Sequence, residues 1–178
     1  MGLPLAPGAT SAVDATATSA RFGSLRDDAD VSLPMVQLHA ASTIRLADHW
    51  DAGPSIVLNL ASRGRPEDVT GGLFVRYWAP ADPDADLVAA LRFEAGWGWG
   101  GLGLDLAFLV AEDASVTLGP TVLITPEFVA ARFPIGAYAH LGPLDLGVEG
   151  GALAAVNGSF RRVSPWMGLR VRLTFGTE

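Results

Sequence analysis

The sequence predicts an all-β protein, a closed antiparallel up-and-down transmembrane β-barrel of ten strands, with eight strands as the alternative. Three observations predict it. From Val36 onward, apolar residues alternate with small or polar residues at a period of two, which is typical of β-strands. The predicted strands are joined by short turns that leave no room for crossover helices. Only 17% of the 178 residues are charged, whereas about 25% are charged in a typical soluble domain.

Nine strands follow from this alternation. The clearest lies over Leu87–Trp99, where the odd positions are apolar and the even positions carry Arg92 and Glu94 among small residues. The glycines within residues 98–101 allow a tight reversal after it, because glycine tolerates positive φ. In chain order the nine are Val36–Leu46, Ser55–Ala61, Leu73–Trp78, Leu87–Trp99, Leu102–Val110, Val116–Ile124, Phe133–Leu141, Leu144–Val156 and Met167–Phe175.

A closed barrel has no edge strands, and single-chain barrels of this kind have an even number of strands. We therefore expect a tenth, weak strand near residues 16–25, inside an N-terminal segment of residues 1–35. The barrel then spans residues 36–175, and residues 176–178 form a tail. Asn157–Ser164 is expected to be a loop. Eight strands would result if one early segment were a loop or a plug.

The alternating faces fit two architectures. The predicted strands from Leu87 to Phe175 have one uncharged apolar face, and the other face is mostly Gly, Ala and Thr with isolated charges. In a transmembrane barrel the apolar face meets lipid. In a soluble calycin-like barrel that binds an apolar ligand, the same face would point inward. A soluble exterior would carry abundant Lys and Glu, whereas this polar face has only isolated charges, which favours the membrane. Aromatic residues near strand ends suit membrane interfaces: Trp78, Trp97, Trp99, Trp166 and Phe175.

Composition excludes several other classes. The net charge of −7 argues against nucleic acid as a partner, because phosphate binding needs a basic surface. The absence of cysteine excludes disulfides, a thiolate nucleophile and zinc-thiolate sites. No run of 18 apolar residues is present, and the N-terminus lacks the basic region of a secretory signal peptide. Pro120 and Pro134 argue against regular strands at their positions, because proline donates no backbone hydrogen bond.

The last predicted strand ends in Phe175, preceded at alternate positions by Leu173, Val171, Leu169 and Met167. This pattern resembles the C-terminal assembly signal of the small bacterial outer-membrane β-barrel proteins, except that residues 176–178 follow the aromatic residue. The resemblance implies a bacterial outer-membrane location with the signal peptide already removed. It also implies both termini on the periplasmic side, and the lipid bilayer and barrel assembly machinery as partners. It leaves the oligomeric state open.

The polar face predicts a charge network inside the barrel. Its expected members are Arg76, Arg92, Glu94, Asp105, Arg132, His140, Asp145, Glu149, Arg170 and Arg172. In the final hairpin, Glu149 is expected to face Arg170 or Arg172, because buried charges need partners. With Arg45 and Arg63 included, arginines exceed carboxylates by three, so a water-filled lumen would prefer small anions. The hypothesis is therefore a narrow anion-leaning channel or a plugged, structural or interaction barrel.

Catalysis has little support in the sequence. His39, His49 and His140 are the only histidines, and no two of them have metal-ligand spacing on one strand. No Gly-x-Ser-x-Gly motif is present. We therefore expect no enzyme activity, metal or cofactor. The alternative is a lipid-modifying outer-membrane enzyme that uses His140 as its base.

Overall fold

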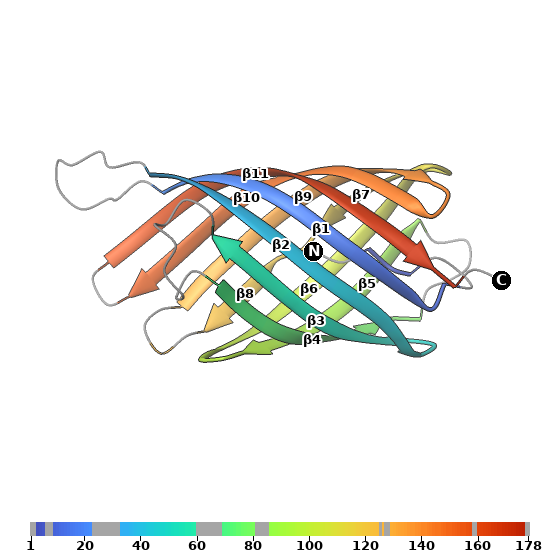
Figure 1. Ribbon diagram of the computed structural model, residues 1–178, viewed down its shortest axis with the longest axis horizontal. Helices are drawn as coiled ribbons and strands as arrows, with labels where there is room; N and C mark the ends of the chain where they lie inside the picture. The colour runs from blue at the N-terminus through green and yellow to red at the C-terminus, as the bar shows by residue number, and fades with distance from the viewer. Residues whose placement is uncertain are drawn as a thin grey trace.

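The computed structural model describes residues 3–5, 9–22, 33–59, 69–80, 86–124, 126, 129–157 and 160–176. These residues form an antiparallel barrel of tilted strands (Figure 1). The strands are β1(Ser11–Phe22), β2(Leu33–Ala47), β3(Trp50–Asn59), β4(Val69–Trp78), β5(Leu87–Gly96), β6(Trp99–Ala111), β7(Ala114–Leu118), β8(Thr121–Ile124), β9(Val129–Leu141), β10(Leu144–Asn157) and β11(Phe160–Phe175). In this part of the chain, no helix has the length and hydropathy of a membrane span.

The barrel has ten strands, because β7 and β8 are successive halves of one strand: both pair with β6 on one side and with β9 on the other. Pairing of β1 with β11 closes the barrel, with Ser11 opposite Phe175. The predicted closed barrel of ten strands is therefore confirmed, and the eight-stranded alternative is wrong.

Two predicted boundaries are wrong. The first strand begins at Ser11, not near residue 16, so the barrel starts inside the segment that was expected to precede it. Its alternation is between alanine and threonine, such as outward Ala15 and inward Thr16, which gives little hydrophobic contrast. At the other boundary, β10 continues to Asn157 and β11 begins at Phe160, so strands occupy most of the expected loop.

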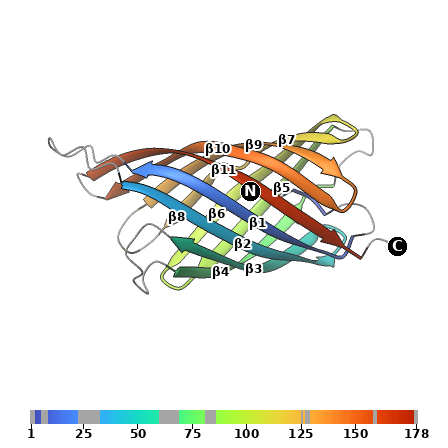
Figure 2. The same cartoon turned by 45° about the horizontal axis from the view of Figure 1, so that its top comes forward.

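The two ends of the barrel differ. The terminal end carries the start of β1, the end of β11 and the turns at residues 48–49, 112–113 and 142–143. The loop end carries the turn at residues 97–98 and the opposite ends of the strands (Figure 2). Gly98 and Gly142 have φ of 75° and 66°, so each turn uses a backbone conformation that glycine adopts without steric cost.

The break between β7 and β8 brings the two expected irregular prolines together. Pro120 lies in the break, where its carbonyl oxygen accepts a hydrogen bond from the Leu104 N–H at 2.9 Å. Pro134 remains inside β9 and accepts from the Gly119 N–H at 3.2 Å. The side of Pro134 that lacks an N–H therefore faces the break, where the regular ladder is already interrupted.

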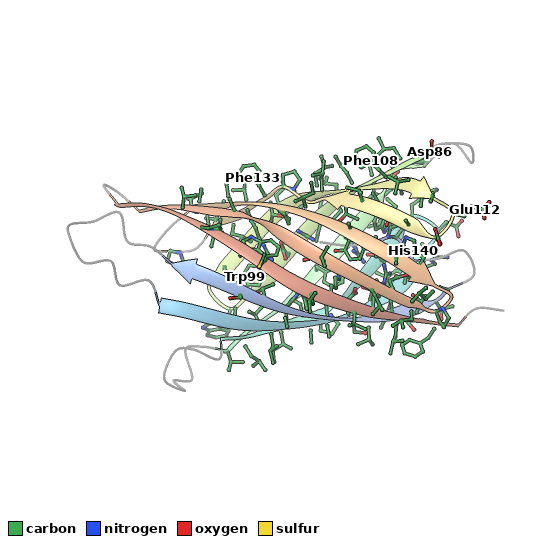
Figure 3. The ribbon with its side chains drawn as sticks, turned by 90° about the horizontal axis from the view of Figure 1, so that it is seen from above. Asp86, Trp99, Phe108, Glu112, Phe133 and His140 are labelled. Atoms are coloured by element: carbon green, nitrogen blue, oxygen red, sulfur yellow. The ribbon has the colours of Figure 1, made fainter. Side chains whose placement is uncertain are left out.

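The two faces of the barrel wall are the reverse of those in a soluble protein: the apolar face points outward and the polar face points inward. Outward Leu73 and Leu169 are 65% and 66% exposed, whereas inward Asp105 and Arg172 are 0% and 1% exposed. Figure 3 shows the same division, with Phe133 on the outside of the wall and His140 within it. The inverted, calycin-like arrangement is therefore wrong. The apolar exterior is the surface expected in contact with hydrocarbon.

Candidate lumen site

The described interior is balanced in charge. Its inward-facing charged residues are six arginines (Arg45, Arg76, Arg92, Arg132, Arg170 and Arg172) and six carboxylates (Asp14, Asp51, Glu94, Asp105, Asp145 and Glu149). The sequence prediction counted four of the carboxylates. Asp14 lies in the expected N-terminal segment of residues 1–35, and Asp51 lies between the predicted strands Val36–Leu46 and Ser55–Ala61, so neither entered that count. With both included, the expected positive excess is not found among these residues. Arg63 lies outside the described part of the chain.

A continuous series of ion pairs, which we call the β3–β6 charge chain, lines one side of the interior. Arg76 Nε lies 2.7 Å from Asp51 Oδ1, and Arg92 Nη1 lies 3.1 Å from Asp105 Oδ1. Arg76 and Arg92 are direct cross-strand neighbours, an arrangement that repels unless an anion lies between them. Asp105 supplies that anion, because its other oxygen lies 3.9 Å from Arg76 Nη1. Glu94 ends the chain, 3.5 Å from Arg92 Nε.

Neutral donors and acceptors complete this chain. Trp78 Nε1 donates to Asp51 Oδ2 at 2.7 Å, and Arg92 Nη2 donates to Thr121 Oγ1 at 2.8 Å. Arg76 Nη2 also donates to Thr43 Oγ1 at 3.3 Å. Buried charges are costly unless they are paired and hydrogen-bonded, so these contacts stabilise the β3–β6 charge chain.

A second group, the β1–β11 charge cluster, lies where the barrel closes. Arg170 Nη2 lies 2.7 Å from Asp14 Oδ1, and Arg170 Nη1 lies 2.8 Å from Glu149 Oε1. Of the two partners that the sequence offered to Glu149, Arg170 therefore makes the ion pair. The Tyr138 hydroxyl donates a hydrogen bond to the same Glu149 oxygen. Arg172 lies at the edge of the cluster, with its Nε 3.8 Å from Asp14 Oδ1.

A glycine makes room for the tyrosine of this cluster. The position that a Cβ atom would take at Gly147 lies 2.3 Å from Tyr138 Cδ1 and 2.9 Å from the Ala137 carbonyl oxygen. Gly147 is the direct cross-strand partner of Tyr138. The tyrosine ring therefore occupies the space that a side chain would fill, and its hydroxyl reaches Glu149.

Three polar side chains from neighbouring strands meet at the terminal end. His140 Nδ1 lies 2.8 Å from Asp145 Oδ1, and His140 Nε2 lies 3.0 Å from Ser115 Oγ. Ser115 is 2% exposed, whereas the side chain of His140 is 25% exposed. Sequence reasoning placed His140 and Asp145 in the lumen but did not single out Ser115, because its position beside the histidine depends on the register between β7 and β9.

Three of the five aromatic residues expected at membrane interfaces face the interior. Trp78 is 9% exposed and binds Asp51. Trp166 lies beneath the guanidinium of Arg132, 4.8 Å from its Cζ to the ring centroid. Trp99 is inward because it pairs with Gly96 across the turn, which restarts the alternation; a Cβ at Gly96 would lie 2.1 Å from Trp99 Nε1 (Figure 3).

The remaining two expected aromatics are exposed: Trp97 at 99% in a turn and Phe175 at 49%. Sequence reasoning missed an outward pair at the terminal end, where the rings of Trp50 and Tyr77 lie 4.9 Å apart. Strand parity would have shown the inward position of Trp78, because it is two residues from inward Arg76.

A cavity of about 370 Å³, including its open mouth, lies between the two charge groups. Its charged lining consists of Arg76, Arg92 and Arg170 with Asp14 and Glu94. His39 also contributes to it. The local lining therefore has one more arginine than carboxylates, although the described interior as a whole is balanced. Among the described residues, no three histidines or carboxylates are grouped as metal ligands would be.

No family model matches the chain, and no curated protein matches it. Solved structures do match its fold. An outer-membrane channel from Pseudomonas putida F1 has a TM-score of 0.59 at 12% identity, over 98% of this chain and 97% of that one. The KdgM porin in complex with disordered oligogalacturonate has a TM-score of 0.53 at 12% identity, over 92% and 99%. The NanC porin has a TM-score of 0.51 at 13% identity, over 93% and 100%. The chain therefore has the fold of the small bacterial outer-membrane β-barrels, as the sequence predicts.

Proposed function

We propose that this chain is a narrow outer-membrane channel, embedded in the lipid bilayer, that passes small anions more readily than cations. The observation that carries the proposal is the cavity between the two charge groups, where three arginines face two carboxylates. A permeating ion must lose part of its hydration in such a space, so the sign of the lining decides which ion enters. The solved channels and porins of the same fold support a channel as the function, and the lining of the cavity supports its preference for anions.

The ion pairs limit the width of the path. The β3–β6 charge chain reaches from Asp51 to Glu94 across four strands, and the β1–β11 charge cluster projects from the opposite wall. Small barrels are often filled by their side chains, and a paired guanidinium is held in place more firmly than a free one. We therefore expect a low conductance and exclusion of large solutes.

The first experiment is refolding into lipid vesicles, followed by electrophoresis with and without boiling and by recording in a planar bilayer. The expected results are a heat-modifiable band and discrete current steps whose reversal potential lies on the chloride side of zero in a KCl gradient. The variant Arg92→Gln should reduce this preference, because Arg92 lines the cavity. Asp48→Asn, in an exposed turn, is the matched control. Cation preference in the parent chain would contradict the proposed selectivity.

Silence in the bilayer would instead favour a structural or interaction barrel, whose charge groups serve to fill and brace the interior. Assembly by the barrel assembly machinery belongs to the same proposal, since the outward alternation that ends in Phe175 is present in β11. Depleting that machinery in cells should then remove the heat-modifiable form.

A second candidate function rests on the contact of His140 with Ser115 and Asp145. Its distances of 3.0 and 2.8 Å are those of a nucleophile, a base and an orienting carboxylate. Ser115 Oγ would attack an ester carbon while His140 Nε2 takes its proton and returns it to the leaving alkoxide. Water would then release the acyl group with the same proton transfers in reverse. Because these side chains face the lumen, the substrate would be a small ester that enters the lumen. It would not be a lipid embedded in the membrane, as the sequence-based alternative has it.

Labelling with a fluorophosphonate tests this candidate independently of conduction. A reactive Ser115 predicts labelling that is lost in both Ser115→Ala and His140→Ala. If the parent chain is not labelled, or if Ser115→Ala labels equally, the three side chains serve as a hydrogen-bonded part of the wall. Thr117→Val is the matched control, as it removes another buried hydroxyl from β7.

A further inference from the structure

Residues 3–5, which precede β1 in the chain, lie inside the barrel at its terminal end. Leu3 and Leu5 are 3% and 7% exposed, although the chain has not yet entered the wall at these positions. Leu5 belongs to an apolar cluster with Ala9 and Ala12, of which Ala12 is an inward residue of β1. Two leucines are thus buried within a lumen whose other described contents are largely polar.

Arginines from the two strands that flank β1 hold the backbone of this segment. Arg172 of β11 donates from Nη1 to the Pro4 carbonyl oxygen at 3.1 Å. Arg45 of β2 donates from Nη2 to the Leu5 carbonyl oxygen at 3.2 Å. Because β1 lies between β11 and β2, the two guanidinium groups bind the segment from either side of the strand that follows it.

Apart from Pro4, Arg172 has one ion-pair contact among the described residues, from its Nε to Asp14 Oδ1 at 3.8 Å. It is 1% exposed, and its Nε and Nη2 have no hydrogen-bond partner among the described residues. A buried guanidinium with unmet donors is unfavourable. The hydrogen bond from Arg172 to the Pro4 carbonyl oxygen therefore lowers the free-energy cost of burying this guanidinium. Arg172 is therefore a binding site in the barrel wall for a backbone carbonyl group.

We infer that Leu3–Leu5 is an internal ligand of the barrel, bound by Arg45 and Arg172, that partly closes the terminal end of the lumen. A hollow open to solvent lies beside the segment, lined by Pro4 and Leu5 and, from the neighbouring strands β3 and β4, by Asp51 and Trp78. Withdrawal of the segment would join this hollow to the lumen. The effect of the segment on conduction rests on the proposed channel function, but the binding of the segment can be tested without measuring any current.

The test uses single-cysteine variants, since the chain contains no cysteine of its own. Leu5→Cys should react with a water-soluble maleimide at least about tenfold more slowly than Asp48→Cys, which lies in an exposed turn at the same end. Adding Arg45→Gln and Arg172→Gln to Leu5→Cys should raise its rate by about tenfold. The heat-modifiable band shows whether this variant has folded; if it has not, Arg45→Gln alone is used.

Equal rates for Leu5→Cys and Asp48→Cys in otherwise intact chains would overturn the inference. Protection of the thiol in Leu5→Cys that neither arginine substitution relieves would also overturn it, because the proposed partners would not be holding the segment. In bilayers, deletion of residues 2–5 should raise the conductance. An unchanged, measurable conductance would refute closure. If neither the intact nor the shortened chain gives currents, both the proposed channel and its closure by the segment are refuted. The reaction rates of the thiol would still decide whether the segment is bound.

Discussion

Asp14 of β1 and Arg170 of β11 are 156 positions apart in sequence and 2.7 Å apart in space, measured from Oδ1 to Nη2. Their ion pair crosses the line along which the first and last strands meet. Arg170 also binds Glu149 of β10. Side chains as well as backbone hydrogen bonds therefore fasten the closure of the barrel.

Replacing Asp14 by Asn should lower the free energy of unfolding by about 3 kcal/mol, because it leaves Arg170 and Arg172 buried with less negative charge between them. Urea titration of the barrel in lipid vesicles measures the change. Asp48→Asn, which alters an exposed carboxylate, should change it by less than about 0.5 kcal/mol. Equal losses in the two variants would mean that the closure ion pair adds nothing to stability.

Gly147→Ala should destabilise the barrel by about 1–3 kcal/mol, because the new methyl group would occupy the place of the Tyr138 ring. Gly150→Ala is the matched control on the same strand. Its Cβ would meet its nearest atom, the Trp166 carbonyl oxygen, at 3.4 Å, so we expect a change within about 0.5 kcal/mol. The same urea titration reports both. A Gly147 variant as stable as the control would show that Tyr138 can be accommodated elsewhere at little cost.

Variants that retain only Trp50 or only Trp78 test the assignment of faces. Both residues lie at the terminal end on adjacent strands, but Trp50 is 43% exposed on the outside and Trp78 is 9% exposed. Brominated acyl chains quench tryptophan fluorescence on contact. They should quench the Trp50 variant and leave the Trp78 variant almost unchanged. Strong quenching of Trp78 would place it in lipid and contradict its hydrogen bond to Asp51.

Glu94→Gln should increase anion preference, because it removes one of the two carboxylates that line the arginine-rich cavity. A unit charge about 4 Å from a permeating ion is worth about 1 kcal/mol in water, so the ratio of anion to cation permeability should rise up to about fivefold. The reversal potential in a KCl gradient measures this ratio. A shift toward potassium would contradict the position of the selective site.

Alternation with a period of two was sufficient to predict an all-β protein and nearly every strand, because it is a local property of the chain. It was insufficient where alternate residues differ little in hydrophobicity or where the alternation is interrupted. The alternation of alanine and threonine in β1 hid its start, and with it Asp14. Asp51 was mistaken for a turn residue because Gly53 and Pro54 interrupt the pattern of β3 just after it.

Contacts within the lumen depend on register and curvature, which no single strand specifies. The pairing of Glu149 with Arg170 could be narrowed to two partners because both lie in one hairpin. The approach of Ser115 to His140 crosses strands whose register is fixed elsewhere in the barrel. The tryptophans show a different limitation of the sequence prediction. Trp78 and Trp166 are predicted at the membrane interface because they lie near strand ends, but their odd or even position along the strand, which decides whether a side chain points inward, is the more informative property.

The pairing of arginines with carboxylates among the described inward side chains has a consequence for insertion into a bilayer. The partners in the β1–β11 charge cluster come from opposite ends of the chain, so an open sheet would present Asp14 and Arg170 without each other. Exposing such charges to hydrocarbon is costly, and the cost falls only when the last strand meets the first. Neutralisation of Asp14 and closure must therefore occur together. This coupling makes partly inserted forms unstable and gives the assembly step an all-or-none character.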